Sequence, residues 1–118
     1  MKIAGTYKLV KYGYQYKANS EFKPISEWYS GCIHYCQSGT MNVIVRFSEK
    51  PEELSDVVSY SGSYEVVGEE IVHRVTHSVR PEYEGQILTR KFILREGELE
   101  TEFEDTAEFR KFAVWRKS

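Results

Sequence analysis

Apolar and polar residues alternate with a period of two along most of this 118-residue chain, and turn residues interrupt the alternation at regular intervals. A period of two is that of a β-strand, because successive side chains of a strand point to opposite faces. The pattern predicts strands at residues 6–12, 31–36, 40–47, 59–67, 70–79, 86–95, 98–104 and 110–116. Eight strands of this kind indicate an all-β fold, a single eight-stranded antiparallel up-and-down β-barrel, with a two-sheet sandwich as the alternative.

Three glycine-containing turns, at 37–39, 68–69 and 96–97, fix which residues face each other across the predicted hairpins. The resulting register pairs Tyr35 with Met41, Tyr64 with His73, and Tyr60 with His77, and it sets Arg90 and Phe92 on the face of Thr101 and Phe103. The inner face is therefore mostly apolar and aromatic. Its informative polar members are His73, His77 and Arg90.

Two segments break the alternation. Residues 13–30 have no clean periodicity, and we expect a long loop there. Residues 48–58 begin with Ser48, which suits the N-cap of a helix that continues through Pro51 and Leu54. We therefore expect one short helix near 49–57.

Composition limits the classes of function. Hydrophobic residues make up 41% of the chain, which is typical of a folded protein, and its length predicts a single domain over 1–118. The net charge of −2 argues against a partner of nucleic acid or anionic membrane, which would favour a basic excess. No apolar run has the length of a membrane span or of a signal-peptide core, so we expect a cytoplasmic protein.

The two cysteines, Cys32 and Cys36, lie on one predicted strand, four residues apart. Their Cα atoms would then be about 13 Å apart, whereas a disulfide needs about 4.4–6.8 Å. We expect free thiols, with a disulfide between two copies of the chain as the alternative.

Several short motifs, taken in order, resemble a known family. Gly5-Thr6-Tyr7 is similar to the Gly-x-Trp opening of lipocalins, with Tyr in place of Trp, and Trp115-Arg116 resembles the arginine that closes the barrel end. Further matching features are Gly31…Tyr35…Gly39-Thr40-Met41, Tyr60-Ser61-Gly62-Ser63-Tyr64, Val72-His73, Pro81…Gly85 and Arg90-Lys91-Phe92. The chain resembles the small bacterial lipocalin-like domain family of the lipocalin (calycin) superfamily. The resemblance implies a lipocalin-like barrel that binds a small hydrophobic ligand.

The inward-facing aromatic and polar residues are the candidate ligand-binding set: Tyr35, Met41, Phe47, Tyr60, Tyr64, His73, His77, Arg90, Phe92 and Trp115. We expect non-enzymatic binding of a small, mostly hydrophobic or amphipathic organic molecule. We assign no catalytic residue, no metal ligand and no cofactor. His73 and His77 stand about 13 Å apart on a strand, so they cannot share one ion.

Arg90 and His73 each allow two interpretations. A buried, unpaired guanidinium is costly, so Arg90 either caps the barrel end against an aromatic ring or anchors a carboxylate or other oxyanion of a ligand. His73 either hydrogen-bonds a tyrosine hydroxyl such as that of Tyr64, or acts with it as a general acid and base. In the second case Arg90 would steady negative charge. The enzymatic alternative is a cyclase or isomerase that uses this Tyr/His/Arg pocket.

Aromatic residues are concentrated within and beside the expected loop, at Tyr12, Tyr14, Tyr16, Phe22 and Trp28-Tyr29. So much aromatic surface should not be left in water. The segment either folds over the barrel mouth as a lid or packs against a second copy of the chain, and we favour the homodimer. A further alternative is a filled barrel that acts only as a homodimeric or partner-binding module.

Overall fold

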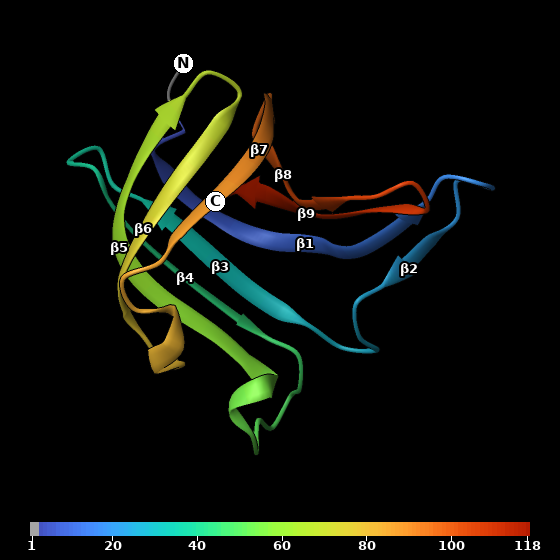
Figure 1. Ribbon diagram of the computed structural model, residues 1–118, viewed down its shortest axis with the longest axis horizontal. Helices are drawn as coiled ribbons and strands as arrows, with labels where there is room; N and C mark the ends of the chain where they lie inside the picture. The colour runs from blue at the N-terminus through green and yellow to red at the C-terminus, as the bar shows by residue number, and fades with distance from the viewer. Residues whose placement is uncertain (1–2) are drawn as a thin grey trace.

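The computed structural model describes residues 3–118, and in it the chain forms one antiparallel sheet that closes on itself (Figure 1). The strands are β1 (Gly5–Tyr16), β2 (Phe22–Pro24), β3 (Ser30–Tyr35), β4 (Thr40–Arg46), β5 (Val57–Val67), β6 (Glu70–Ser78), β7 (Ile87–Arg95), β8 (Glu98–Asp105) and β9 (Phe109–Lys117). The order is β2-β1-β3-β4-β5-β6-β7-β8-β9, with a further pairing between β1 and β9. That pairing closes a barrel of eight strands, as predicted, and leaves β2 as a short addition beside β1.

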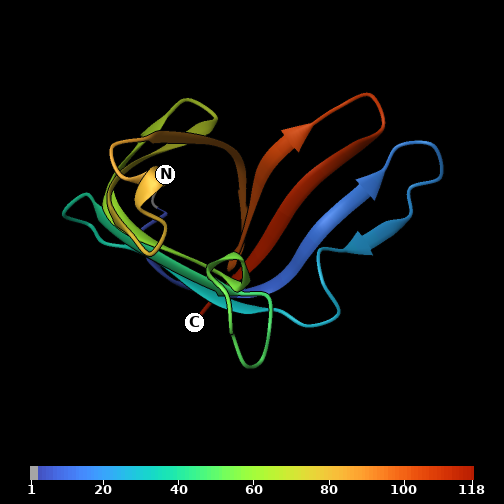
Figure 2. The same ribbon diagram turned by 60° about the horizontal axis from the view of Figure 1, so that its bottom comes forward.

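The barrel is closed at one end and splayed at the other. Strand β1 pairs with β3 only through Gly5–Lys8, whereas it pairs with β9 from Tyr7 to Tyr16. Strand β7 pairs with β6 through residues 87–91 and with β8 through residues 91–95. The far halves of β1, β8 and β9 therefore leave the ring as an arm, which Figure 2 shows diverging from the curved wall of β3 to β6.

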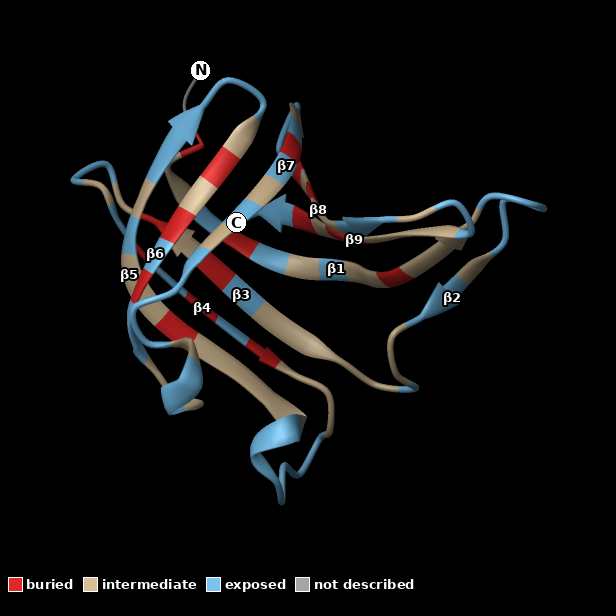
Figure 3. Cartoon of the chain, in the orientation of Figure 1, coloured by how far each residue is buried: buried red, intermediate tan, exposed pale blue. Residues whose placement is uncertain are grey.

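The closed end is filled by side chains. Tyr7, Tyr35, Ile71 and Leu99 are the largest fully buried residues, and the Tyr7 hydroxyl donates to the carbonyl of Ile3 at 2.8 Å. Figure 3 shows the buried residues alternating with exposed ones along the strands of the barrel. The sequence pattern and the barrel therefore agree on which face is the interior.

A β-bulge between β5 and β6 corrects one predicted register. Tyr64 pairs with His73 as expected, but Ser61 pairs with His77 and Gly62 with Val75, so Thr76 is the additional residue on β6. The predicted pair of Tyr60 with His77 is wrong, and His77 points to solvent. The cause is local: a Cβ at position 62 would lie 1.9 Å from the carbonyl oxygen of Arg74, so only glycine permits this approach.

The expected loop at 13–30 is in part a strand. β1 continues to Tyr16 after a bulge between Leu9 and Lys11, and β2 pairs back onto it. Phe112 of β9 points outward because it alternates with the inward-facing Ala113, and the Phe22 ring covers it with ring centroids 5.9 Å apart. Burial of Phe112 beneath Phe22 therefore stabilises the short strand β2 in the otherwise irregular segment.

Helical structure is limited to two 3-10 turns in residues 3–118, η1 (Leu54–Asp56) and η2 (Pro81–Tyr83). The short helix expected near 49–57 is therefore only the turn η1. Its N-cap is Glu53 rather than Ser48, and the Asp56 carboxylate accepts the Glu52 N–H at 3.1 Å. In the described part of the chain, no helix is long and apolar enough to cross a membrane. Cys32 and Cys36 are free thiols, as predicted.

Replacement of Gly62 by alanine tests the role of the bulge. We expect Gly62→Ala to lower the free energy of unfolding by about 2–3 kcal/mol, because the methyl group must displace backbone. Urea denaturation of Gly62→Ala and of Ser63→Ala, which changes an exposed neighbour on β5, measures the difference. Equal stability of the two variants would contradict this explanation of the register.

Candidate ligand-binding site

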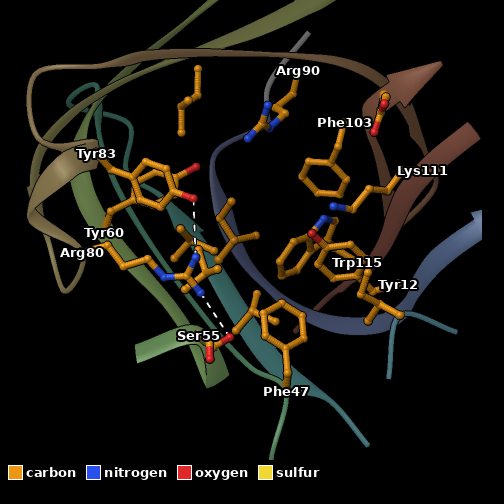
Figure 4. Close-up of a pocket in the computed structure, with 17 residues that line it drawn as sticks. Tyr12, Phe47, Ser55, Tyr60, Arg80, Tyr83, Arg90, Phe103, Lys111 and Trp115 are labelled. Carbon is orange, nitrogen blue, oxygen red and sulfur yellow. Dashed lines mark hydrogen bonds between the residues drawn. The ribbon is translucent and has the colours of Figure 1, made fainter. Parts of the chain in front are cut away.

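A cavity of about 570 Å³ lies inside the splayed end of the barrel. It adjoins the filled core: along β4, Met41 lies in the core away from the cavity, whereas Val43 and Val45 are core residues that also line the cavity. The complete lining is Tyr12, Ile25, Ile33, Val43, Val45, Phe47, Ser55, Val58, Tyr60, Arg80, Tyr83, Leu88, Arg90, Phe103, Glu104, Lys111 and Trp115. Figure 4 shows these side chains converging from the two sides of the opening.

Aliphatic and aromatic side chains form the inner wall. Ile33, Val43 and Val45 contribute from β3 and β4, and they are inward members of the period-two pattern. Trp115 of β9 closes the inner side, and its indole N–H donates to the hydroxyl of Thr101 at 3.0 Å. This hydrogen bond satisfies the polar atom of the indole within the protein, so Trp115 presents apolar surface to the cavity.

The rim of the cavity carries the polar side chains of Arg80 and Lys111, which contact other protein groups. Arg80 of the segment before η2 donates to the carbonyls of Leu54 and Ser55, both at 3.2 Å, so it ties the two 3-10 turns together. Figure 4 shows this contact at one side of the cavity and Lys111 at the other. The Lys111 ammonium lies 6.0 Å from the centroid of Tyr12. Arg80 is therefore held by hydrogen bonds within the protein, whereas the contacts of Lys111 in the described residues are with the aromatic rings of Tyr12 and Tyr14.

Arg90 differs from the other cations of the cavity. Its Nε atom is buried and has no hydrogen-bond partner within residues 3–118, and no described carboxylate lies within 4.0 Å of its guanidinium. Its protein contacts are one 3.4 Å hydrogen bond from Nη1 to the carbonyl of Thr89 and stacking over Phe103, 4.9 Å from the ring centroid. The positive charge of Arg90 therefore lines the cavity without an ion pair, and the one carboxylate residue of the lining, Glu104, lies beyond 4.0 Å from it.

His73 lies behind the inner wall, between two tyrosine hydroxyls. The Tyr35 hydroxyl is 2.7 Å from Nε2, and the Tyr60 hydroxyl is 2.7 Å from Nδ1. Burial, together with the positive charge of Arg90, lowers the pKa of His73 to about 3. Burial raises the pKa of Tyr60 to about 12, against the opposing influence of Arg90. All three rings are therefore neutral at neutral pH.

Comparison with known proteins identifies the fold family. The model of the family described as lipocalin-like domain matches residues 4–117. The chain belongs to the lipocalin-like domain family. No curated protein matches it. Among solved structures it is similar to a redesigned β-barrel, at 8% sequence identity and a TM-score of 0.48, over 98% of this chain and 91% of that one.

The lipocalin-like domain divides the predicted site residues between its two ends. Phe47, Tyr60, Arg90 and Trp115 line the cavity. The remaining inward residues belong to the packed interior beyond it: Tyr35, Met41, Tyr64, His73 and Phe92. His77 is exposed on the outside, because the β5–β6 bulge reverses its direction. A barrel of this family with an open cavity suggests ligand binding.

The predicted trio of Tyr64, His73 and Arg90 does not meet at one point. Although Tyr64 and His73 are cross-strand partners, the Tyr64 hydroxyl donates to the carbonyl of Cys36 at 2.8 Å. Both ring nitrogens of His73 are occupied by the other two tyrosines. The arrangement therefore holds His73 as a structural hydrogen-bonding group.

Sequence reasoning missed the rim of the cavity. Lys111 alternates with Ala113 and Trp115 along β9, which has no bulge, so it faces inward on the same side as the predicted Trp115. Arg80 and Tyr83 lie in the η2 connection, whose path a period-two pattern does not specify.

The buried His73 of this lipocalin-like domain makes a pH-dependent contribution to stability. Unfolded histidine titrates near pH 6.5, whereas the folded ring resists protonation down to pH about 3. Between these values the unfolded chain binds the additional proton, so stability falls as pH is lowered, by up to about 1.4 kcal/mol per unit. Urea denaturation at several pH values should show a shallower pH slope for His73→Gln than for the wild type. His77→Gln, which changes an exposed ring, should keep the wild-type slope, and an unchanged slope in His73→Gln would contradict this account.

Proposed function

We propose that this lipocalin-like domain binds a small organic anion with a mostly apolar body and does not convert it chemically. The cavity volume lies within the range of about 300–1,000 Å³ that is usual for small-molecule sites. Its walls offer apolar contacts from Val43, Val45 and Leu88, and an aromatic face from Trp115. The apolar body of a ligand would lie against these residues.

The unpaired Arg90 guanidinium carries the proposal. The Arg90 side chain is half-buried, and its buried Nε–H lacks an acceptor, which costs the free energy of a lost hydrogen bond. A carboxylate, sulfonate or phosphate would accept from this fork of donors and neutralise its charge. The Arg90 Cζ atom lies 4.9 Å from the centroid of the Phe103 ring, so this ring contributes a cation–π contact to the position of the guanidinium.

Two alternatives have less support. A cyclase or isomerase needs a group that takes or gives a proton beside the substrate, and the neutral His73 has both nitrogens engaged behind the cavity wall. A filled barrel that serves only as a docking module is difficult to reconcile with a cavity of about 570 Å³ lined by a free cation. Neither alternative explains why Arg90 lacks a carboxylate partner.

Two matched fluorescent probes test the proposal. 1-Anilinonaphthalene-8-sulfonate and N-phenyl-1-naphthylamine share the same aromatic body and differ by one sulfonate. We expect the wild type to prefer the sulfonate, and we expect Arg90→Met to lower that preference by about tenfold or more, as the loss of a charged hydrogen-bonded contact implies. Fluorescence titration of both probes gives the ratio of the two dissociation constants.

Arg95→Met is the matched control for the loss of one positive charge. Arg95 lies on the same strand, β7, but is exposed at the hairpin. We expect this variant to keep the wild-type preference for the sulfonate. If Arg90→Met and Arg95→Met change the preference equally, the effect is one of net charge, and the proposed site is wrong.

A further inference from the structure

The hydrogen-bond balance around Tyr35 determines the direction of the Tyr35–His73–Tyr60 chain. The Tyr35 side chain is 1% exposed, and within residues 3–118 its hydroxyl has one hydrogen-bond partner, the Nε2 atom of His73. A buried hydroxyl hydrogen without an acceptor is costly. The Tyr35 O–H therefore donates to Nε2, which must carry a lone pair.

A neutral imidazole has one N–H and one lone pair, so the proton of His73 resides on Nδ1. The Nδ1–H then donates to the oxygen of Tyr60 at 2.7 Å. Burial of the ring, and secondly the positive charge of Arg90, lower the pKa of His73 and disfavour a second proton on the ring, so the neutral form persists. The direction is thus fixed from the closed end of the barrel outward: Tyr35 donates to His73, and His73 donates to Tyr60.

Tyr60 ends this chain at the cavity wall. Because its oxygen accepts from His73, its own hydrogen is free to point away from the ring. Tyr60 is 8% exposed, and the face it shows is the lining of the cavity. The buried pair of Tyr35 and His73 therefore turns an amphoteric hydroxyl into a group that presents a donor to the ligand.

We propose that Tyr60 is a ligand-contacting hydrogen-bond donor, held in that role by Tyr35 and His73, and that the ligand presents an oxygen acceptor to it. This inference rests on the proposed function for the existence of the ligand. It adds the chemical class: an amphipathic anion whose polar end offers acceptors both to the Arg90 fork and to the Tyr60 hydroxyl, such as a carboxylate, sulfonate or phosphate. Tyr35 and His73 are positioning residues, since they act on the ligand only through Tyr60.

The proton position on His73 provides a test that needs no ligand. Long-range 1H–15N NMR of the histidine-labelled wild type distinguishes an imidazole protonated on Nδ1 from one protonated on Nε2. We expect the Nδ1–H form for His73 at pH 7. The Nε2–H form would overturn the inference, because Tyr60 would then be the donor to His73 and its hydrogen would not reach the cavity.

The contact with the ligand is tested with the same pair of naphthalene probes. We expect Tyr60→Phe to lower the preference for the sulfonate over the uncharged amine by about tenfold, as the loss of a hydrogen bond to a charged acceptor implies. Tyr64→Phe is the matched control, because it removes a hydroxyl from the same strand that bonds to the carbonyl of Cys36 instead. An unchanged preference in Tyr60→Phe would overturn the inference.

The NMR experiment and the probe titrations together distinguish failure of the proposed anion binding from failure of the proposed role of Tyr60. If the wild type shows no preference for the sulfonate, the proposed anion binding fails, while the proton position on His73 still decides the orientation of Tyr60. If the wild type prefers the sulfonate but His73 is protonated on Nε2, anion binding stands and the role of Tyr60 is wrong. If Tyr60→Phe does not fold, the NMR result on the wild type decides the inference.

Discussion

The unequal pairing of β1 with β3 and with β9 is the constraint on which the rest of the structure depends. Its first residues hold β3, and almost its whole length holds β9, so the ring closes over a short stretch and opens beyond it. Strand β7 repeats this behaviour when it changes partner from β6 to β8 at Lys91. These two changes of partner give the barrel a packed end and a hollow end from one continuous sheet.

The charged group Arg90 and the hydrogen bonds of His73 lie at the boundary between the packed end and the hollow end of the barrel. Arg90 projects into the cavity beside Phe103, next to the point where β7 leaves β6. Behind the wall, the field of the guanidinium and burial keep His73 neutral between two tyrosines. Arg90, which has no ion pair, and Tyr60, whose hydroxyl is oriented by His73, therefore line the same cavity. A ligand bound through apolar contacts alone would need neither a cation nor an oriented hydroxyl.

The sequence predicts the fold and the interior well wherever the period of two is unbroken. The pairs of Tyr35 with Met41 and of Tyr64 with His73 follow from turn residues and alternation, and so does the inward position of Arg90. The errors begin at bulges, because one additional residue reverses the parity of everything beyond it. His77 was misplaced for this reason.

The rim and the hydrogen-bond partners could not be read from the chain. Arg80 reaches η1 through a connection that has no periodicity, and its partners are backbone carbonyls, which no sequence motif marks. The sequence suggested a tyrosine partner for His73, but the cross-strand neighbour is not the one that bonds. Tyr64 tilts to the carbonyl of Cys36, whereas Tyr35 reaches His73 from across the barrel.

The central claim is that Arg90 meets an anion inside the cavity, and the NMR signal of its Nε–H group tests this most directly. Titration with 1-anilinonaphthalene-8-sulfonate should move this signal strongly downfield, since the orphan donor gains a charged acceptor. The Arg90→Met variant assigns the signal. N-phenyl-1-naphthylamine should move it little. A signal that stays in place when the protein is saturated with the sulfonate, or that responds equally to both probes, would contradict the account.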